Sequence, residues 1–198
     1  MKKMVLGLMV VAGLLGTSTV VANAADTTTG DVAFSKGTLS MSVNNTNLSF
    51  GTGNTISVTD EYLGVSTAPT VEVSDLRGTN EGWSLNVAQD QQFNTETNGS
   101  GSELTNAALT ITSTEDSSDS TVNTATATLN PGKTTSGTTT NGAASKVVAS
   151  ASAGHGNGIS TFSFGSSKLF VPGATPKLSK GYTTTLTWSL TDAPSNSK

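Results

Sequence analysis

The side chains with the most distinctive chemistry are two tryptophans, one arginine and one histidine, in a chain that contains no cysteine. The lack of cysteine excludes disulfides, thiolate nucleophiles and cysteine-ligated metal centres. A single histidine excludes a multi-histidine metal site, and any catalytic triad would have to use His155. These counts leave paired carboxylates, backbone anion sites and aromatic contacts as the chemistry to consider.

The paired carboxylates are Asp60 with Glu61 and Glu115 with Asp116, and such pairs can serve glycoside hydrolysis or calcium binding. Adjacent strand residues point to opposite faces, however, and no Asp-x-Asp-x-Asp-Gly spacing occurs. We interpret both pairs as solvated loop charge. We therefore predict no catalytic residue, no metal site and no cofactor.

The glycine-rich residues 154–158 surround His155 and could present backbone N–H groups to an anion. The simpler interpretation is a turn that needs positive φ angles, with His155 exposed. The formal net charge of −4 provides no basic footprint, which argues against a nucleic-acid partner.

The first 24 residues have the features of a secretory signal peptide rather than of a folded segment. Lys2 and Lys3 precede an apolar run over residues 4–15, and Ala22-Asn23-Ala24 matches a small-x-small cleavage site. Residues 25–198 would then form the mature chain, with eight basic and 14 acidic side chains and a net charge of −6. No later segment is apolar enough for a membrane anchor, so we expect an exported protein without membrane insertion.

The elements that position these side chains read as β-strands throughout. Short stretches alternate between apolar and hydroxyl residues, and turn-forming residues separate them. Residues 182–191 give the longest alternation, which predicts a half-buried antiparallel strand. The 35 threonines and 27 serines suit the solvated faces of such strands. We predict an all-β, antiparallel, sandwich-like single domain. The shorter predicted strand faces are Ile56 with Val58 and Trp83 with Leu85 and Val87, and the predicted core is Leu39, Met41, Val71, Val73, Leu85, Val87, Leu109, Ile111, Phe164, Leu169, Leu186 and Leu190.

Residues 112–142 contain many Ser, Thr and Gly residues and few apolar ones. We interpret them as a long hairpin or insertion, with turns at Pro131-Gly132 and Asn141-Gly142. A linker between two domains is the alternative.

Both tryptophans stand in the same local pattern, Trp-x-Leu, about a hundred residues apart. The first copy, Trp83 and Leu85, follows Asp-Leu-Arg-Gly-Thr at residues 75–79, which contains Arg77. The second copy, Trp188 and Leu190, lies in a Tyr-x-x-x-Leu-Thr-Trp-x-Leu-x-Asp-x-Pro segment that begins at Tyr182. This pairing resembles the WxL domain of Gram-positive cell-surface proteins, over roughly residues 28–194.

The resemblance implies a secreted protein that is attached non-covalently to the cell wall through peptidoglycan. It also implies possible partners among other WxL proteins or surface proteins of the WxL-interacting kind. The binding or site-shaping residues would be Trp83, Leu85, Trp188, Leu190, Arg77 and Tyr182.

Two interpretations of the tryptophans stay open at this point. Tryptophan and leucine two residues apart share one strand face, so each motif can be core packing or an exposed surface for sugar rings. We expect Trp83 and Trp188 to lie near one another in space, on neighbouring strands or facing sheets, and Arg77 to pair with Asp75 or Glu81. Three function classes follow: a wall-binding module, a scaffold that binds another surface protein, and a wall-degrading enzyme. The enzyme is disfavoured because the sequence offers no plausible set of catalytic groups.

Overall fold

The alternation of apolar and hydroxyl residues is realised as fourteen β-strands in the part of the chain that the structure describes. The structure is a computed structural model, and it describes residues 28–116, 122–135 and 138–192. No helix occurs in these three ranges, so none of them contains a helix that could cross a membrane. The prediction of an all-β fold is confirmed.

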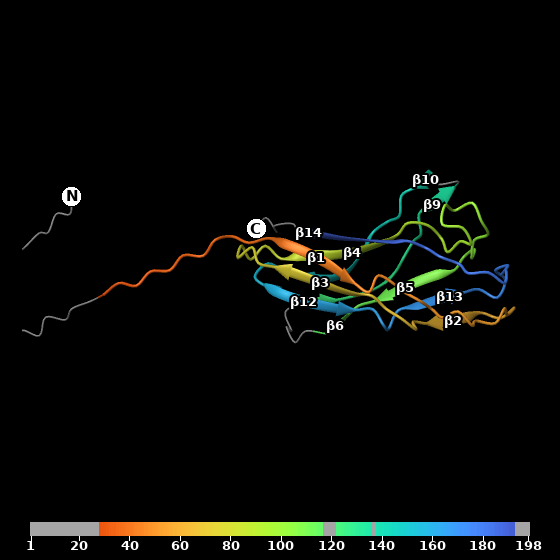
Figure 1. Cartoon of the computed structure of the whole chain (residues 1–198), viewed down its shortest axis with the longest axis horizontal. Coiled ribbons are helices and arrows are strands. Elements are labelled where there is room, and N and C mark those ends of the chain that lie inside the picture. Colours follow the sequence, from red (N-terminus) through yellow and green to blue (C-terminus); the bar gives the residue numbers. More distant parts are fainter. Residues whose placement is uncertain (1–27, 117–121, 136–137, 193–198) are drawn as a thin grey trace, which may run out of the picture. The chain divides into compact units, whose positions relative to one another are not determined.

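Twelve of the strands form three antiparallel sheets of four strands each, and the remaining two form a hairpin (Figure 1). The β1 sheet has the order β1 (Leu39–Asn44), β3 (Thr70–Asp75), β12 (Gly158–Ser163) and β6 (Thr114–Glu115). The β14 sheet has the order β14 (Leu186–Asp192), β4 (Trp83–Gln89), β11 (Lys146–Ala151) and β7 (Val122–Thr124). The β2 sheet has the order β2 (Glu61–Gly64), β13 (Lys168–Val171), β5 (Ala108–Thr112) and β8 (Thr126–Thr128), and the hairpin pairs β9 (Lys133–Thr135) with β10 (Thr138–Asn141).

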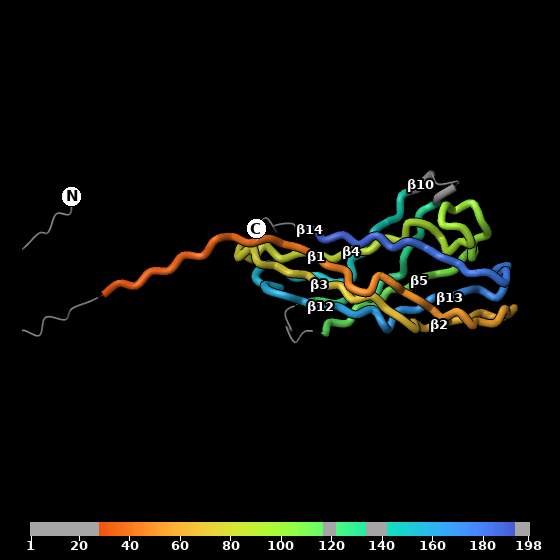
Figure 2. The backbone as a smooth tube through the Cα atoms, in the orientation of Figure 1, coloured from red at the N-terminus to blue at the C-terminus, as the bar shows by residue number. Residues whose placement is uncertain are grey.

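The β1 and β2 sheets are built from successive passages of the same chain. The chain runs directly from β2 to β3, from β5 to β6 and from β12 to β13, as the backbone trace shows (Figure 2). The β14 sheet packs against the β1 sheet, because Trp83 of β4 makes an edge-to-face contact with Phe162 of β12, at 5.9 Å between ring centroids. The described residues between 35 and 192 form one unit, and residues 28–34 belong to a separate one.

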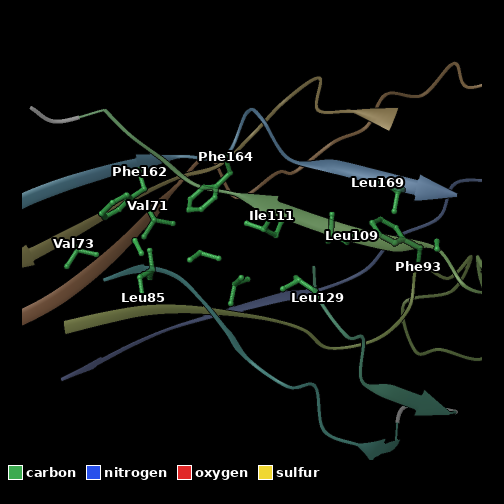
Figure 3. Close-up of a cluster of buried hydrophobic side chains, with 14 of the residues drawn as sticks. Val71, Val73, Leu85, Phe93, Leu109, Ile111, Leu129, Phe162, Phe164 and Leu169 are labelled. Carbon is green, nitrogen blue, oxygen red and sulfur yellow. The ribbon is translucent and has the colours of Figure 1, made fainter. Parts of the chain in front are cut away.

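The core lies between these sheets and contains side chains from all three (Figure 3). Eight of the twelve predicted core residues are buried, and the four at the edge strands are half-buried and pack against the core. The eight are Val71, Val73, Leu85, Val87, Leu109, Ile111, Phe164 and Leu169, and the four are Leu39, Met41, Leu186 and Leu190.

Two predicted strands differ from the observed ones. The strand expected at Ile56 and Val58 is absent, because the Ser57 hydroxyl accepts a hydrogen bond from the Thr59 N–H at 3.0 Å and so stabilises a local turn. The strand expected over residues 182–191 begins only at Leu186, since Thr183 instead forms an isolated bridge with Asn94.

The segment predicted as an insertion, residues 112–142, contributes one strand to each sheet before it forms the β9–β10 hairpin. Its strands β6, β7 and β8 lie at the edges of the three sheets, and Leu129 is buried in the core. Since strands from both sides of this segment share the same sheets, the linker alternative was wrong. The predicted signal peptide lies outside the described residues.

Candidate functional site

The two Trp-x-Leu motifs lie on neighbouring antiparallel strands, β4 and β14, as predicted. The register pairs Leu85 directly with Leu190, while Trp83 faces Asp192 and Trp188 faces Val87. The tryptophans are therefore offset by four residues, about 13 Å along the strands, so the strands are neighbours as predicted but the two tryptophans are not direct partners. The leucines join the two motifs, and the tryptophans flank that leucine pair at opposite ends.

Trp83 is fully enclosed in the core, with an exposed fraction of 0%. Its indole N–H donates a hydrogen bond to the carbonyl oxygen of Gly156 at 3.0 Å, which satisfies the one polar group of a buried tryptophan. Leu85 is equally buried. Of the two interpretations left open by the sequence, core packing applies to Trp83 and Leu85.

The glycine-rich loop at residues 154–158 covers the Trp83 indole. Gly156 has a φ angle of 69°, and a Cβ atom at this position would lie 2.3 Å from the Ala151 Cβ and 2.7 Å from the Trp83 Nε1. Only glycine satisfies both the backbone angle and the close approach. His155 is exposed in this turn, so the simpler interpretation of the loop is confirmed.

Trp188 differs from Trp83 in that one side of it reaches solvent. It is half-buried, and its ring stacks in a tilted arrangement on Phe164, at 4.7 Å between centroids. It also lines an open groove of about 720 Å³ that runs between the edge strands β1 and β14. The apolar lining of this groove comes from Leu39 and Met41 of β1 and from Trp188 and Leu190 of β14.

Both strands that border the groove pair on one side only among the described residues. β1 pairs with β3, and β14 pairs with β4. Each strand therefore presents a row of free backbone N–H and C=O groups toward a groove with half-buried apolar walls. Leu39 and Met41, predicted as core residues, pack against the core and also form a wall of this groove.

Arg77 organises an ion cluster at the wall of the groove, in which Arg77 and Asp75 are buried while Glu81 and Asp192 are largely exposed. Its guanidinium binds the Asp75 carboxylate in a bidentate manner, through Nε at 2.9 Å and Nη2 at 2.7 Å. It also donates to the Gly82 carbonyl oxygen at 2.6 Å, to Glu81 at 3.3 Å and to Asp192 at 2.5 Å. The predicted intramolecular pairing of Arg77 is confirmed.

The contact between Arg77 and Asp192 joins the two motif segments at a sequence separation of 115 residues. Asp192 was not predicted as a partner of Arg77. Its position in the second motif segment, two residues after Leu190, was the available indication in the sequence. Strand pairing puts Asp192 opposite Trp83 and so brings it to the arginine. The cluster thus fixes the end of β14 to the turn that precedes β4.

The electrostatics of this cluster depend on the close Asp75–Arg77 pair. Hydrogen bonds from Arg77 lower the pKa of Asp75 below its ordinary range, although burial acts in the opposite direction. The same hydrogen bonds raise the pKa of Arg77. Both side chains are about 95% or more buried, and their mutual hydrogen bonds favour the ionised forms that burial alone would disfavour.

Tyr182 lies outside the lining of the groove. Its hydroxyl accepts a hydrogen bond from the Leu178 N–H at 2.8 Å, and its ring packs against the edge of the core. In this structure Tyr182 closes the turn that leads into β14. Its predicted role in shaping the site stays a prediction.

The carboxylate pairs take part in local structure. Asp60 accepts a hydrogen bond from the Gly173 N–H at 2.8 Å, and Asp116 accepts one from the Ser163 hydroxyl at 3.1 Å. In the part of the chain that the structure describes, no three His, Asp or Glu side chains are grouped so that they could hold a metal ion.

The fold and the groove define a class of protein: an all-β domain with an open groove between two sheet edges, in which Trp188 and three aliphatic side chains lie among polar and charged ones. The chain matches the family model of the WxL domain, described as surface cell wall-binding, over residues 19–194. It therefore belongs to the WxL family, a cell-surface, wall-binding family rather than a catalytic one. No curated protein and no solved structure matches it.

Proposed function

We propose that this WxL domain holds the protein at the cell wall by binding peptidoglycan non-covalently, in the groove between β1 and β14. The mature chain would begin at Ala25 after removal of residues 1–24. The partly exposed Trp188 is the observation that carries this proposal, because it offers an aromatic ring within an open groove. Aromatic faces stack on the C–H faces of sugar rings, and the hydroxyls of Ser40 and Ser189 in the groove can bind sugar hydroxyls.

In this proposal the two motifs have different roles. Trp83 and Leu85 are core residues that fix β4 in place, whereas Trp188 and Leu190 on β14 contact the ligand. Arg77 holds the end of β14 through Asp192 and so sets the width of the groove. These residues shape one site although only the second motif reaches solvent.

A second candidate function is supported by the free strand edges. An extended segment of another surface protein, of the WxL or WxL-interacting kind, could pair with β1 or β14 and insert alternate side chains into the groove. The two functions are separated by comparing co-sedimentation on purified peptidoglycan, stripped of accessory polymers, with capture on the ectodomain of such a partner.

Trp188→Ala is the variant that tests the groove as the binding site. This change should weaken peptidoglycan binding roughly tenfold, since it removes the aromatic contact, and a tenfold loss corresponds to about 1.4 kcal/mol. The measurement is co-sedimentation with purified peptidoglycan at a temperature where circular dichroism shows that the variant is folded.

Leu186→Ala is the matched control for this prediction. Leu186 is half-buried on the same strand and packs against the core, but it does not line the groove. Its replacement should lower stability in a similar way and leave binding unchanged. Equal binding by Trp188→Ala and the wild-type protein would contradict the assignment of the groove.

A further inference from the structure

The most exposed aromatic side chain of residues 35–192, where the structure describes them, is Tyr62 rather than either tryptophan. Tyr62 is 73% exposed on the outer face of β2, and its ring lies 4.9 Å from that of Phe170, centroid to centroid, at an interplanar angle of 38°. The strand register makes the two residues direct partners between β2 and β13, which lie side by side (Figure 1). The Tyr62–Phe170 pair thus forms a double-ring surface on the solvent face of the β2 sheet.

The surroundings of the Tyr62–Phe170 pair are polar. Lys168 lies on the same face, two residues before Phe170, and its register partners are Gly64 and Thr110. A Cβ atom on Gly64 would meet nothing within 4 Å, so there is open space beside Lys168. The hydroxyls of Thr110 and Thr128 are 3.0 Å apart and continue the polar surface across β5 and β8.

This combination fits a carbohydrate better than a protein partner. A stable protein interface buries about 800 Å² on each side, which far exceeds the area of two rings surrounded by hydroxyls. Two adjacent rings match the scale of one or two sugar units, whose C–H faces stack on aromatic faces. Threonine hydroxyls can exchange hydrogen bonds with sugar hydroxyls and acetamido groups.

The charge on this face is complementary to the wall polymer. Lys168 is the one charged residue on the outer face of the four described strands of the β2 sheet. The peptides attached to a peptidoglycan glycan strand end in carboxylates, which an exposed ammonium group can pair with. The two rings can therefore stack on sugar rings, the threonine hydroxyls can bind sugar hydroxyls, and Lys168 can pair with a peptide carboxylate.

We infer that the Tyr62–Phe170 pair, with Lys168, is a second contact surface for the amino-sugar backbone of peptidoglycan, separate from the groove at Trp188. This inference rests on the proposed peptidoglycan-binding function and adds a site to it. Two contact surfaces on one domain raise the overall affinity of a weak binder for a repetitive polymer, because the second contact forms at high effective concentration.

The test uses the mature chain and two probes: purified peptidoglycan, and a tetramer of β-1,4-linked N-acetylglucosamine that carries no peptide. Binding of the tetramer is measured by titration calorimetry in the Trp188→Ala background, where the groove contributes little. Adding Tyr62→Ala should weaken tetramer binding roughly tenfold. Tyr62→Phe should restore most of the affinity, because it retains the ring.

Ile159→Ala is the matched control for lost apolar surface. Ile159 is 59% exposed on β12, on a different sheet, so its replacement should leave tetramer binding as it was. Unchanged tetramer binding by Tyr62→Ala, with wild-type peptidoglycan binding intact, would overturn the second surface and leave the proposed function standing. Weaker capture of a partner ectodomain by Tyr62→Ala, without change in tetramer binding, would overturn it in favour of a protein contact. Failure of the wild-type chain to bind peptidoglycan would overturn both proposals.

Discussion

Trp83→Ala is expected to lower the free energy of unfolding by about 3–5 kcal/mol, the range for large-to-small changes of buried aromatic residues. Trp83 is fully buried, contacts Phe162 edge to face and donates a hydrogen bond to Gly156. Its removal would leave a cavity at the junction of β4 and β12 and would take away the hydrogen bond from the indole N–H to the Gly156 carbonyl oxygen. For a domain of this size, the melting temperature should fall by roughly 10 °C.

A graded series of variants keeps this expectation testable if the alanine variant does not fold. Trp83→Phe retains an aromatic ring but removes the indole N–H, so it should cost about 1–3 kcal/mol through the smaller ring and the lost hydrogen bond to the Gly156 carbonyl oxygen. Trp188→Ala should be less destabilising than Trp83→Ala because Trp188 is only half-buried. Thermal and urea unfolding of the mature chain, followed by circular dichroism, provides the measurement. If Trp83→Ala and Trp188→Ala lowered the melting temperature equally, the assignment of Trp83 alone to the sealed core would be wrong.

Arg77→Met is expected to destabilise the domain by about 3–5 kcal/mol at neutral pH, because removing one partner of a buried ion pair leaves the other charge uncompensated. The charge left behind is Asp75, whose side chain is 2% exposed. Arg77→Lys should be intermediate in stability, since an ammonium group cannot bind Asp75 in the same bidentate manner while also reaching Gly82 and Asp192. The double variant Asp75→Asn/Arg77→Met should be more stable than Arg77→Met alone.

The pH dependence of stability should reverse between the wild-type protein and Arg77→Met. In the wild type, the folded-state pKa of Asp75 lies below its unfolded value of about 3.9, so the unfolded chain binds more protons and stability falls as the pH drops below about 4. In Arg77→Met, burial without the arginine raises the folded-state pKa of Asp75. The folded state then binds more protons, and acidification toward pH 5 should increase stability.

Urea unfolding of both proteins between pH 3 and pH 7 tests this reversal, with Asp75→Asn/Arg77→Met as the control that lacks both groups. Parallel pH profiles of the wild type and Arg77→Met would show that the Asp75–Arg77 pair does not govern acid stability. Loss of Arg77 should also disturb the groove, because Arg77 holds the end of β14 through Asp192.

The sequence by itself determined which side chains face inward and which face outward. A period of two fixes alternation along each strand whatever the partner strand is, so Val71, Val73, Leu85 and Val87 were assigned correctly to the core. The same periodicity gave the all-β class, and the two Trp-x-Leu motifs indicated the WxL family. The failure at Ile56 and Val58 also has a local cause, since the Ser57 hydroxyl competes with strand pairing.

Tertiary structure alone decided which half-buried residues line a surface groove and which residues far apart in the sequence come into contact. Leu39, Met41, Trp188 and Leu190 follow the same alternation as core residues, yet they line a groove because β1 and β14 lie at sheet edges. Edge position follows from the order of strands, which depends on long-range pairing and is not encoded in local periodicity. The pairing of β4 with β14 likewise brings Asp192 to Arg77, and that of β2 with β13 brings Tyr62 to Phe170. The strand pattern of this WxL domain is therefore local information, whereas its candidate binding surfaces arise only when strands far apart in the chain become neighbours.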